Sequence, residues 1–167
     1  MRRILLLLLL LPLAASGLPA GRTVPKAKLT AILSEAQRCE GAEMVQLGRV
    51  GTGAVKVLVR AAARRDPDAR QALGLLRGVK RLSVLEYGDC APEVREHLNR
   101  RLADALDGSE LLMEAKDGSS AMRLFGIVDE ASGTVRDFVL HSPDGCSLVC
   151  IFGSIPLNAL EKAFADD

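Results

Sequence analysis

Residues 110–153, ELLMEAKDGSSAMRLFGIVDEASGTVRDFVLHSPDGCSLVCIFG, contain four strand-like runs separated by short turn sequences. In the first run Leu111, Met113 and Ala115 recur at every second position, which is typical of a strand with one buried face. The separators DGS, ASG and PDG are typical of tight turns, whereas a parallel connection needs about a dozen residues or more. The stretch therefore predicts an antiparallel four-stranded meander. Its turns are expected at Asp117-Gly118, Ser132-Gly133 and Asp144-Gly145.

The rest of the chain has the pattern of helices around two further strands. Helices are expected over residues 28–41, 52–65, 66–78, 88–108 and 156–164, and strands over residues 43–50 and 79–87. The apolar face expected for the helix over 52–65 consists of Val55, Leu58, Val59 and Ala62. This order predicts one α+β domain over residues 21–167, with a single mixed or antiparallel sheet and helices packed mainly on one of its faces.

Residues 1–20 are predicted to be a secretory signal peptide. Two arginines precede the apolar run 4–11, and small residues follow it, so cleavage is expected after Gly17, with Ala20 as the second choice. The apolar run is too short for the ~20 residues of a helix that spans a bilayer. No cysteine lies near the cleavage site to carry a lipid. We therefore expect an exported protein, periplasmic or secreted, with neither a membrane span nor a lipid anchor.

The charge balance and the scarcity of aromatic residues exclude several classes of ligand. The chain has 22 basic and 21 acidic side chains, and loss of the signal peptide removes two arginines. A neutral chain with interspersed charges gives no electrostatic reason to bind nucleic acid or an anionic membrane surface. With no Trp, one Tyr and four Phe, the chain also lacks the stacked rings of sugar-binding and single-strand-binding proteins.

The segment GRVGTGAVK, residues 48–56, follows a strand candidate and opens a helix, as phosphate-binding loops do. It lacks the third glycine of a dinucleotide fingerprint, because Lys56 occupies that position, and it contains no Gly-Lys-Ser/Thr sequence. We interpret it as an ordinary tight turn, and no cofactor is expected.

Cys90 precedes the start of a helix, where aligned amide groups can lower the pKa of a thiol. His97 lies two turns further along, roughly 10 Å away, and His141 could approach Cys90 only through tertiary folding. Zinc sites usually contain closely spaced Cys or His pairs, which the chain lacks. No catalytic, cofactor-binding or metal-binding residue is therefore predicted, and the balance is against an enzyme.

The four cysteines, Cys39, Cys90, Cys146 and Cys150, are candidates for disulfides, because exported proteins meet an oxidising environment. Residues four apart in a strand lie about 13 Å apart, so Cys146 and Cys150 cannot bond each other. At least one disulfide is expected. If two form, Cys146 and Cys150 pair with Cys39 and Cys90 in one order or the other. The alternative is that Cys150 is a small apolar core residue.

Three segments also carry a resemblance to a known family. They are LLRGVKRLSVLEYGD (75–89), the meander with its turns (110–145), and SLVCIFGSIPLNALEKAF (147–164). Their apolar positions and turns resemble the domain of unknown function 4252 (DUF4252), found in exported proteins of Bacteroidota-type bacteria. The resemblance implies a location in the bacterial envelope and no established activity. The chain departs from many relatives in lacking an anchor cysteine, and its four cysteines are not part of the family pattern.

These observations lead to a hypothesis about function. We expect an exported envelope protein that acts as a non-enzymatic binding or interaction domain, with another envelope protein as its partner. One alternative is a binder of a small apolar ligand between the meander and the helices. The other is an unrecognised hydrolase or thiol enzyme.

Overall fold

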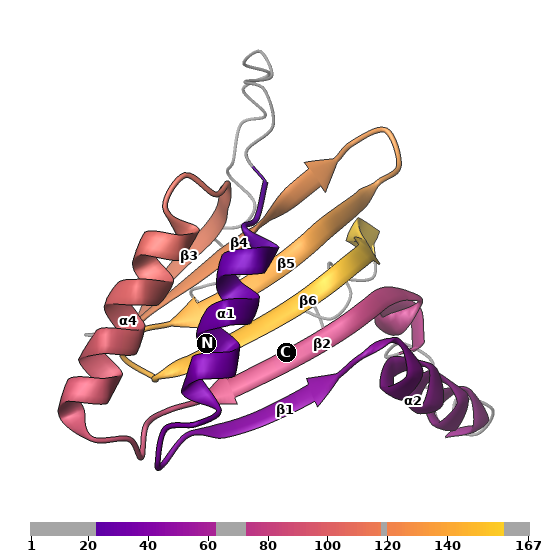
Figure 1. Cartoon of the computed structure of the whole chain (residues 1–167). Helices are drawn as coiled ribbons and strands as arrows, with labels where there is room; N and C mark the ends of the chain where they lie inside the picture. The colour runs from indigo at the N-terminus through magenta and orange to yellow at the C-terminus, as the bar shows by residue number, and fades with distance from the viewer. Residues whose placement is uncertain (1–22, 63–72, 118–119, 159–167) are drawn as a thin grey trace.

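The computed structural model describes residues 23–62, 73–117 and 120–158 (Figure 1). Two helices, α1 and α4, lie side by side across one face of a six-stranded sheet, and a third, α2, lies beyond one end of strands β1 and β2. The helices are α1 (Lys26–Ala36), α2 (Arg49–Ala62) and α4 (Pro92–Leu106). The strands are β1 (Glu43–Leu47), β2 (Gly78–Glu86), β3 (Leu111–Asp117), β4 (Ser120–Asp129), β5 (Thr134–Ser142) and β6 (Ser147–Pro156).

The strand order in the sheet is β1-β2-β6-β5-β4-β3, and all neighbours are antiparallel. Strands β3 to β6 form the predicted meander, so the predicted α+β class is confirmed. The β4–β5 turn contains Gly133 at φ 59°, and Asp144-Gly145 lies between β5 and β6. Asp117 pairs with Ser120 across the first turn, but Gly118 lies outside the described residues.

Several element boundaries differ from the prediction. β1 ends at Leu47, three residues early, because the Thr52 backbone N–H donates to the Gly48 carbonyl at 2.8 Å and closes the first turn of α2. α1 stops at Ala36, and a turn that ends in Gly41 at φ 83° follows it.

Two predicted helices fall partly outside the described residues. Of the helix predicted over 66–78, the structure describes residues 73–78; residues 73–76 are helical and Gly78 already begins β2. Pro156 is the last residue of β6 and residues 157–158 are helical, so most of the predicted helix over 156–164 lies beyond the described part.

The core has two parts because side chains alternate between the faces of the sheet. On β6, Leu148, Cys150 and Phe152 face the layer that contains α1 and α4, whereas Ile151 and Ile155 belong to the opposite side. The larger cluster joins the two helices to the sheet. The smaller one contains Val79, Leu124, Val135, Phe138 and Ile155.

Two glycines bring β2 and β6 unusually close together. A Cβ atom on Gly78 would overlap the Ser154 carbonyl oxygen, and one on Gly153 would overlap the Gly78 carbonyl oxygen. Gly153 also has φ 136°, a conformation that side chains rarely permit. The register between the strands shifts at this place, so the glycines accommodate a bulge.

Candidate functional site

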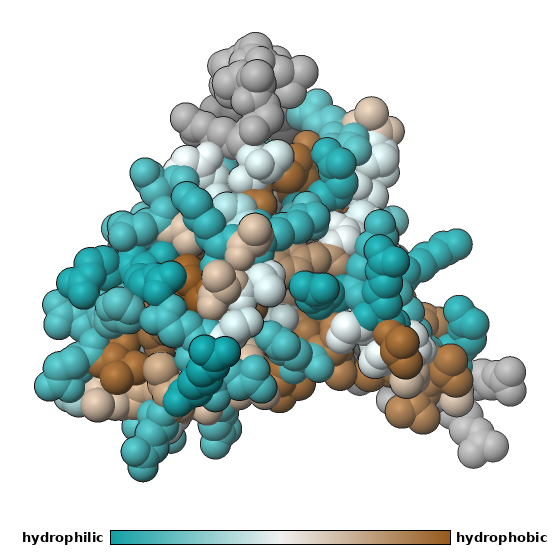
Figure 2. Space-filling model, viewed as in Figure 1, coloured by the Kyte–Doolittle hydropathy of each residue, from teal (hydrophilic) through white to brown (hydrophobic). Residues whose placement is uncertain are grey.

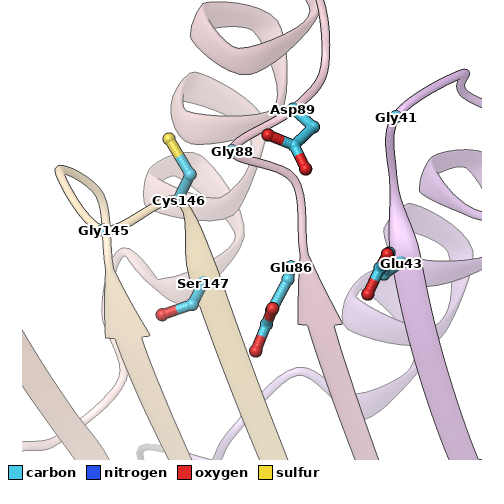
Figure 3. A pocket seen from close by; sticks show the side chains of 8 residues that line it. All are labelled: Gly41, Glu43, Glu86, Gly88, Asp89, Gly145, Cys146 and Ser147. Atoms are coloured by element: carbon cyan, nitrogen blue, oxygen red, sulfur yellow. The ribbon is translucent and has the colours of Figure 1, made fainter.

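Acidic side chains surround a hollow of about 420 Å³ at the end of the sheet where β1 begins and β2 ends (Figure 3). Glu43 and Glu86 are directly opposite each other in the β1–β2 pair, and Asp89 lies in the loop that follows β2. Cys146 and Ser147 complete the wall from the start of β6. The pairing of β1 with β2 brings the carboxylates together, and nothing in their sequence spacing indicated this.

The hollow does not have the geometry of a metal site. Among the residues that the structure describes, no group of three or more His, Cys, Asp or Glu side chains could hold a metal ion. Glu43 and Glu86 instead place two like charges opposite each other, an arrangement that destabilises a strand pair unless a cation or water screens it.

All four cysteines lie within the described ranges, and all four are free thiols. The expected disulfide is therefore not seen in this structure. Cys150 lies inside β6, opposite Ser83 on one side and Val139 on the other. It is fully buried, and burial raises the pKa of its thiol to about 12. Cys150 thus fits the alternative, a small apolar residue of the core.

Cys90 is not activated by its place before α4. Burial raises the pKa of its thiol, and the nearby Cys39, Asp89 and Cys146 raise it further. This is the opposite of the shift that a nucleophilic cysteine needs. Cys39 is partly exposed, and its Sγ donates to the Glu35 carbonyl at 3.7 Å.

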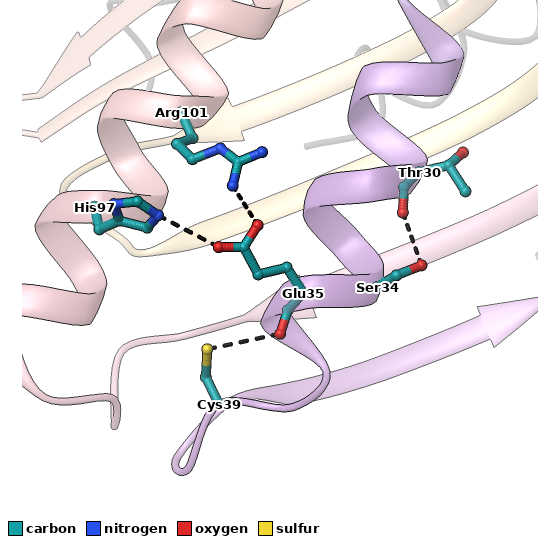
Figure 4. Close-up of polar contacts among 6 residues, drawn as sticks. All are labelled: Thr30, Ser34, Glu35, Cys39, His97 and Arg101. Carbon is teal, nitrogen blue, oxygen red and sulfur yellow. Dashed lines mark hydrogen bonds and ion pairs between the residues drawn. The ribbon is translucent and has the colours of Figure 1, made fainter.

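His97 lies at the α1–α4 contact, on its outer side (Figure 4). Its Nε2 is 3.3 Å from the Glu35 carboxylate, and Arg101 donates to the other oxygen of the same group. Both side chains are partly exposed, so the pairs link the two helices but contribute little to stability.

His141 belongs to a buried polar cluster beneath α4. Its Nε2 is 3.4 Å from the Tyr87 hydroxyl, which donates to Asn99 Oδ1 at 2.5 Å. Asn99 in turn donates to the Pro143 carbonyl at 3.2 Å. Burial, with a smaller effect from the positive charge of Arg123, lowers the pKa of His141 to about 4. The imidazole is therefore neutral near pH 7 and has a structural role in this cluster.

A second hollow, of about 250 Å³, lies between the end of α4 and the meander. Leu106, Leu111 and Phe125 supply apolar walls, and Arg123 and His141 supply polar ones. Ser109 also lines it, and its buried hydroxyl has no hydrogen-bond partner among the residues described.

Helix α2 is attached to the sheet by its polar side. The Thr52 hydroxyl lies 3.3 Å from the Lys80 carbonyl, and Lys56 Nζ donates to the Val79 carbonyl at 2.6 Å and to the Arg77 carbonyl at 3.2 Å. The opposite side of the helix is apolar and exposed, and Figure 2 shows apolar residues gathered over it. The outward residues are Val50, Ala54, Val57, Leu58 and Ala61, which we call the α2 stripe.

The predicted apolar face of this helix is only partly buried. Leu58 is 70% exposed, whereas Val55 and Val59 are partly buried. The side chain of Ala62 lies outside the described residues. Thr52 and Lys56 face β2 on the side of the helix opposite the α2 stripe, so Leu58 faces outward.

Comparison of the chain with protein-family models, with curated proteins and with solved structures found no match. The resemblance to the DUF4252 family therefore stays a prediction. Among the described residues, no helix is both long and apolar enough to cross a membrane.

Proposed function

We propose that this protein is an exported, non-enzymatic binding domain of the cell envelope, and that the α2 stripe is its docking surface. The observation that carries the proposal is the orientation of α2. Val50, Val57 and Leu58 are 89%, 65% and 70% exposed, although each is of a residue type that usually lies inside. A contiguous apolar patch of this kind is typical of an interaction site.

The titratable groups support a binding role over a catalytic one. His141 is neutral and engaged with Tyr87, and the thiols of Cys90 and Cys150 have raised pKa values. A general base or a thiol nucleophile needs a pKa nearer the working pH.

Site-specific photo-crosslinking tests the docking surface. A photoreactive amino acid replaces Val57 in one variant and Glu93, exposed on α4, in a matched control. Irradiation of intact cells should give adducts, with protein or with lipid, from position 57 and none from position 93. Equal labelling at both positions, or none at either, would contradict the proposal.

Export is a separate part of the proposal with its own test. Sequencing of the N-terminus of protein recovered from the periplasm or the medium should begin at residue 18, or at residue 21 if cleavage follows Ala20. Full-length protein retained in the cytoplasm would contradict it.

A further inference from the structure

We propose that the α2 stripe and the cations around it bind the surface of an anionic phospholipid membrane. This inference rests on the proposed function, since it uses the same face and names the partner as a lipid surface. It starts from the spacing of the stripe. Positions 50, 54, 57, 58 and 61 recur at intervals of three and four, which places them within roughly 100° of arc on a helix.

A row of cations borders the stripe. Arg49, Lys56 and Arg60 are spaced by seven and four residues, so they share one line along α2. Arg49 and Arg60 are exposed, whereas the Lys56 Nζ donates to carbonyls of β2. The backbone carbonyls of Arg77 and Lys80 contact α2, so these two residues lie next to the helix, and Arg81 follows them on β2; the side chains of all three are exposed. Residues 49–62 and 73–85 contain no acidic residue. An apolar helical face next to a basic segment favours contact with an anionic membrane surface.

The stripe fits a lipid better than a protein partner. The cores of protein interfaces are enriched in aromatic residues, Met and Arg, which anchor in pockets of the partner. The stripe consists of Val, Ala and Leu alone. Short aliphatic side chains need no shaped pocket, and a fluid acyl layer accommodates them.

The acidic end of the molecule does not cancel the attraction. Glu86 lies at the opposite end of β2 from Gly78, eight residues away. At about 3.3 Å per residue this is roughly 26 Å, several times the ~8 Å over which physiological salt screens a charge. Asp137 lies closer, because it accepts from the Gly153 N–H beside Val79, but Lys26 pairs with it at 2.8 Å. The basic end therefore still meets a membrane as a local positive surface.

Vesicle binding of the mature protein tests the inference. The chain has no Trp, so Leu58→Trp places a single indole fluorophore on the stripe. Vesicles of phosphatidylcholine with phosphatidylglycerol should shift its emission to the blue and sediment the protein, and phosphatidylcholine alone should not. High salt should reverse the binding. The double variant Lys80→Gln/Arg81→Gln should bind at least tenfold more weakly in sedimentation.

A matched control removes the same charge elsewhere. Arg38 and Arg100 are exposed and lie outside the basic segments, so Arg38→Gln/Arg100→Gln should keep the affinity. Equal weakening by both pairs, or no binding to phosphatidylglycerol, would overturn the inference. If the emission instead shifts with protein concentration and the sedimenting mass doubles, the stripe pairs two copies. The proposed binding function would then stand and the lipid inference would fail.

Discussion

At the scale of single residues, His141 shows how a buried polar group makes stability depend on pH. The folded protein holds the imidazole neutral, with a pKa of about 4 against 6.5 when it is unperturbed. Between these values the unfolded chain binds a proton that the folded chain does not bind. The free energy of unfolding therefore rises with pH through this window. Above pH 6.5 neither state binds the proton, so His141 no longer lowers the free energy of unfolding.

We predict that acidification from about pH 6.5 to about pH 5 lowers the free energy of unfolding by about 2 kcal/mol through this residue. Urea denaturation at a series of pH values measures it. His141→Gln cannot take up the proton and should flatten the dependence. His97→Gln removes an imidazole from a partly exposed position and serves as the control. An unchanged slope in His141→Gln would contradict the assignment.

The thiols of the cysteines differ in how accessible they are to reagents, and we predict that Cys39 reacts before Cys150. Cys39 is partly exposed and should be alkylated first at neutral pH. Cys150 is fully buried with a pKa of about 12, so it should react only when the protein unfolds. Mass spectrometry of alkylated peptides over time gives the order, and the same reaction in urea should label both equally. Labelling of native Cys150 at the rate of Cys39 would contradict the structure.

Residue-scale features were partly predictable. The alternation of Leu148, Cys150 and Phe152 made a core role for Cys150 an explicit alternative, because period two depends on local spacing alone. The carboxylates of Glu43, Glu86 and Asp89 could not be grouped in this way. Their proximity comes from the pairing of two strands that lie far apart in the chain, with α2 between them.

At the scale of elements, the β2–β6 contact depends on Gly78 and Gly153. We predict that Gly78→Ala lowers the free energy of unfolding by about 1–3 kcal/mol, because its Cβ would overlap the Ser154 carbonyl and force the strands apart. Chemical denaturation measures the loss. Gly53→Ala is the control: apart from its chain neighbours and the backbone of its own helix, nothing lies within 4 Å of the added Cβ, and alanine favours the helix by up to about 1 kcal/mol. Equal effects of the two changes would contradict this account.

The sequence predicted the meander and most element types, since turn signals and periodicity are local. The exposure of Leu58 on α2 was not predicted, because a helix with apolar residues on most of its sides has no unique inward direction by pattern alone. Lys56 donates to a carbonyl of β2 and the Thr52 hydroxyl lies near another, and those contacts exist only in the folded protein.

At the scale of the whole molecule, charge is segregated although the total is near zero. The basic segments lie around α2, and Glu43, Glu86 and Asp89 lie at the other end of the β1–β2 pair. The net charge is summed over the whole sequence and does not show where the charges lie. Composition therefore gave no reason to expect an anionic partner. Local potential depends on where the charges lie.

We therefore predict that the mature protein binds a cation exchanger at pH 7 despite its near-neutral charge. Lys80→Gln/Arg81→Gln should elute at clearly lower salt than Arg38→Gln/Arg100→Gln, although the two variants have the same net charge. Elution in a salt gradient measures the difference. Identical elution would show that the positive charges do not act as one surface.

The place of β6 in the sheet has a consequence for biosynthesis. This strand lies between β2 and β5, yet the ribosome makes it after all the others. Until residues 147–156 emerge, β2 lacks its inner neighbour, and the β1–β2 pair cannot join the meander. Pairing between distant segments is slow to form, so the sheet closes only after β6 has been made. Until then the facing edges of β2 and β5 lack their partner and are open to wrong pairing.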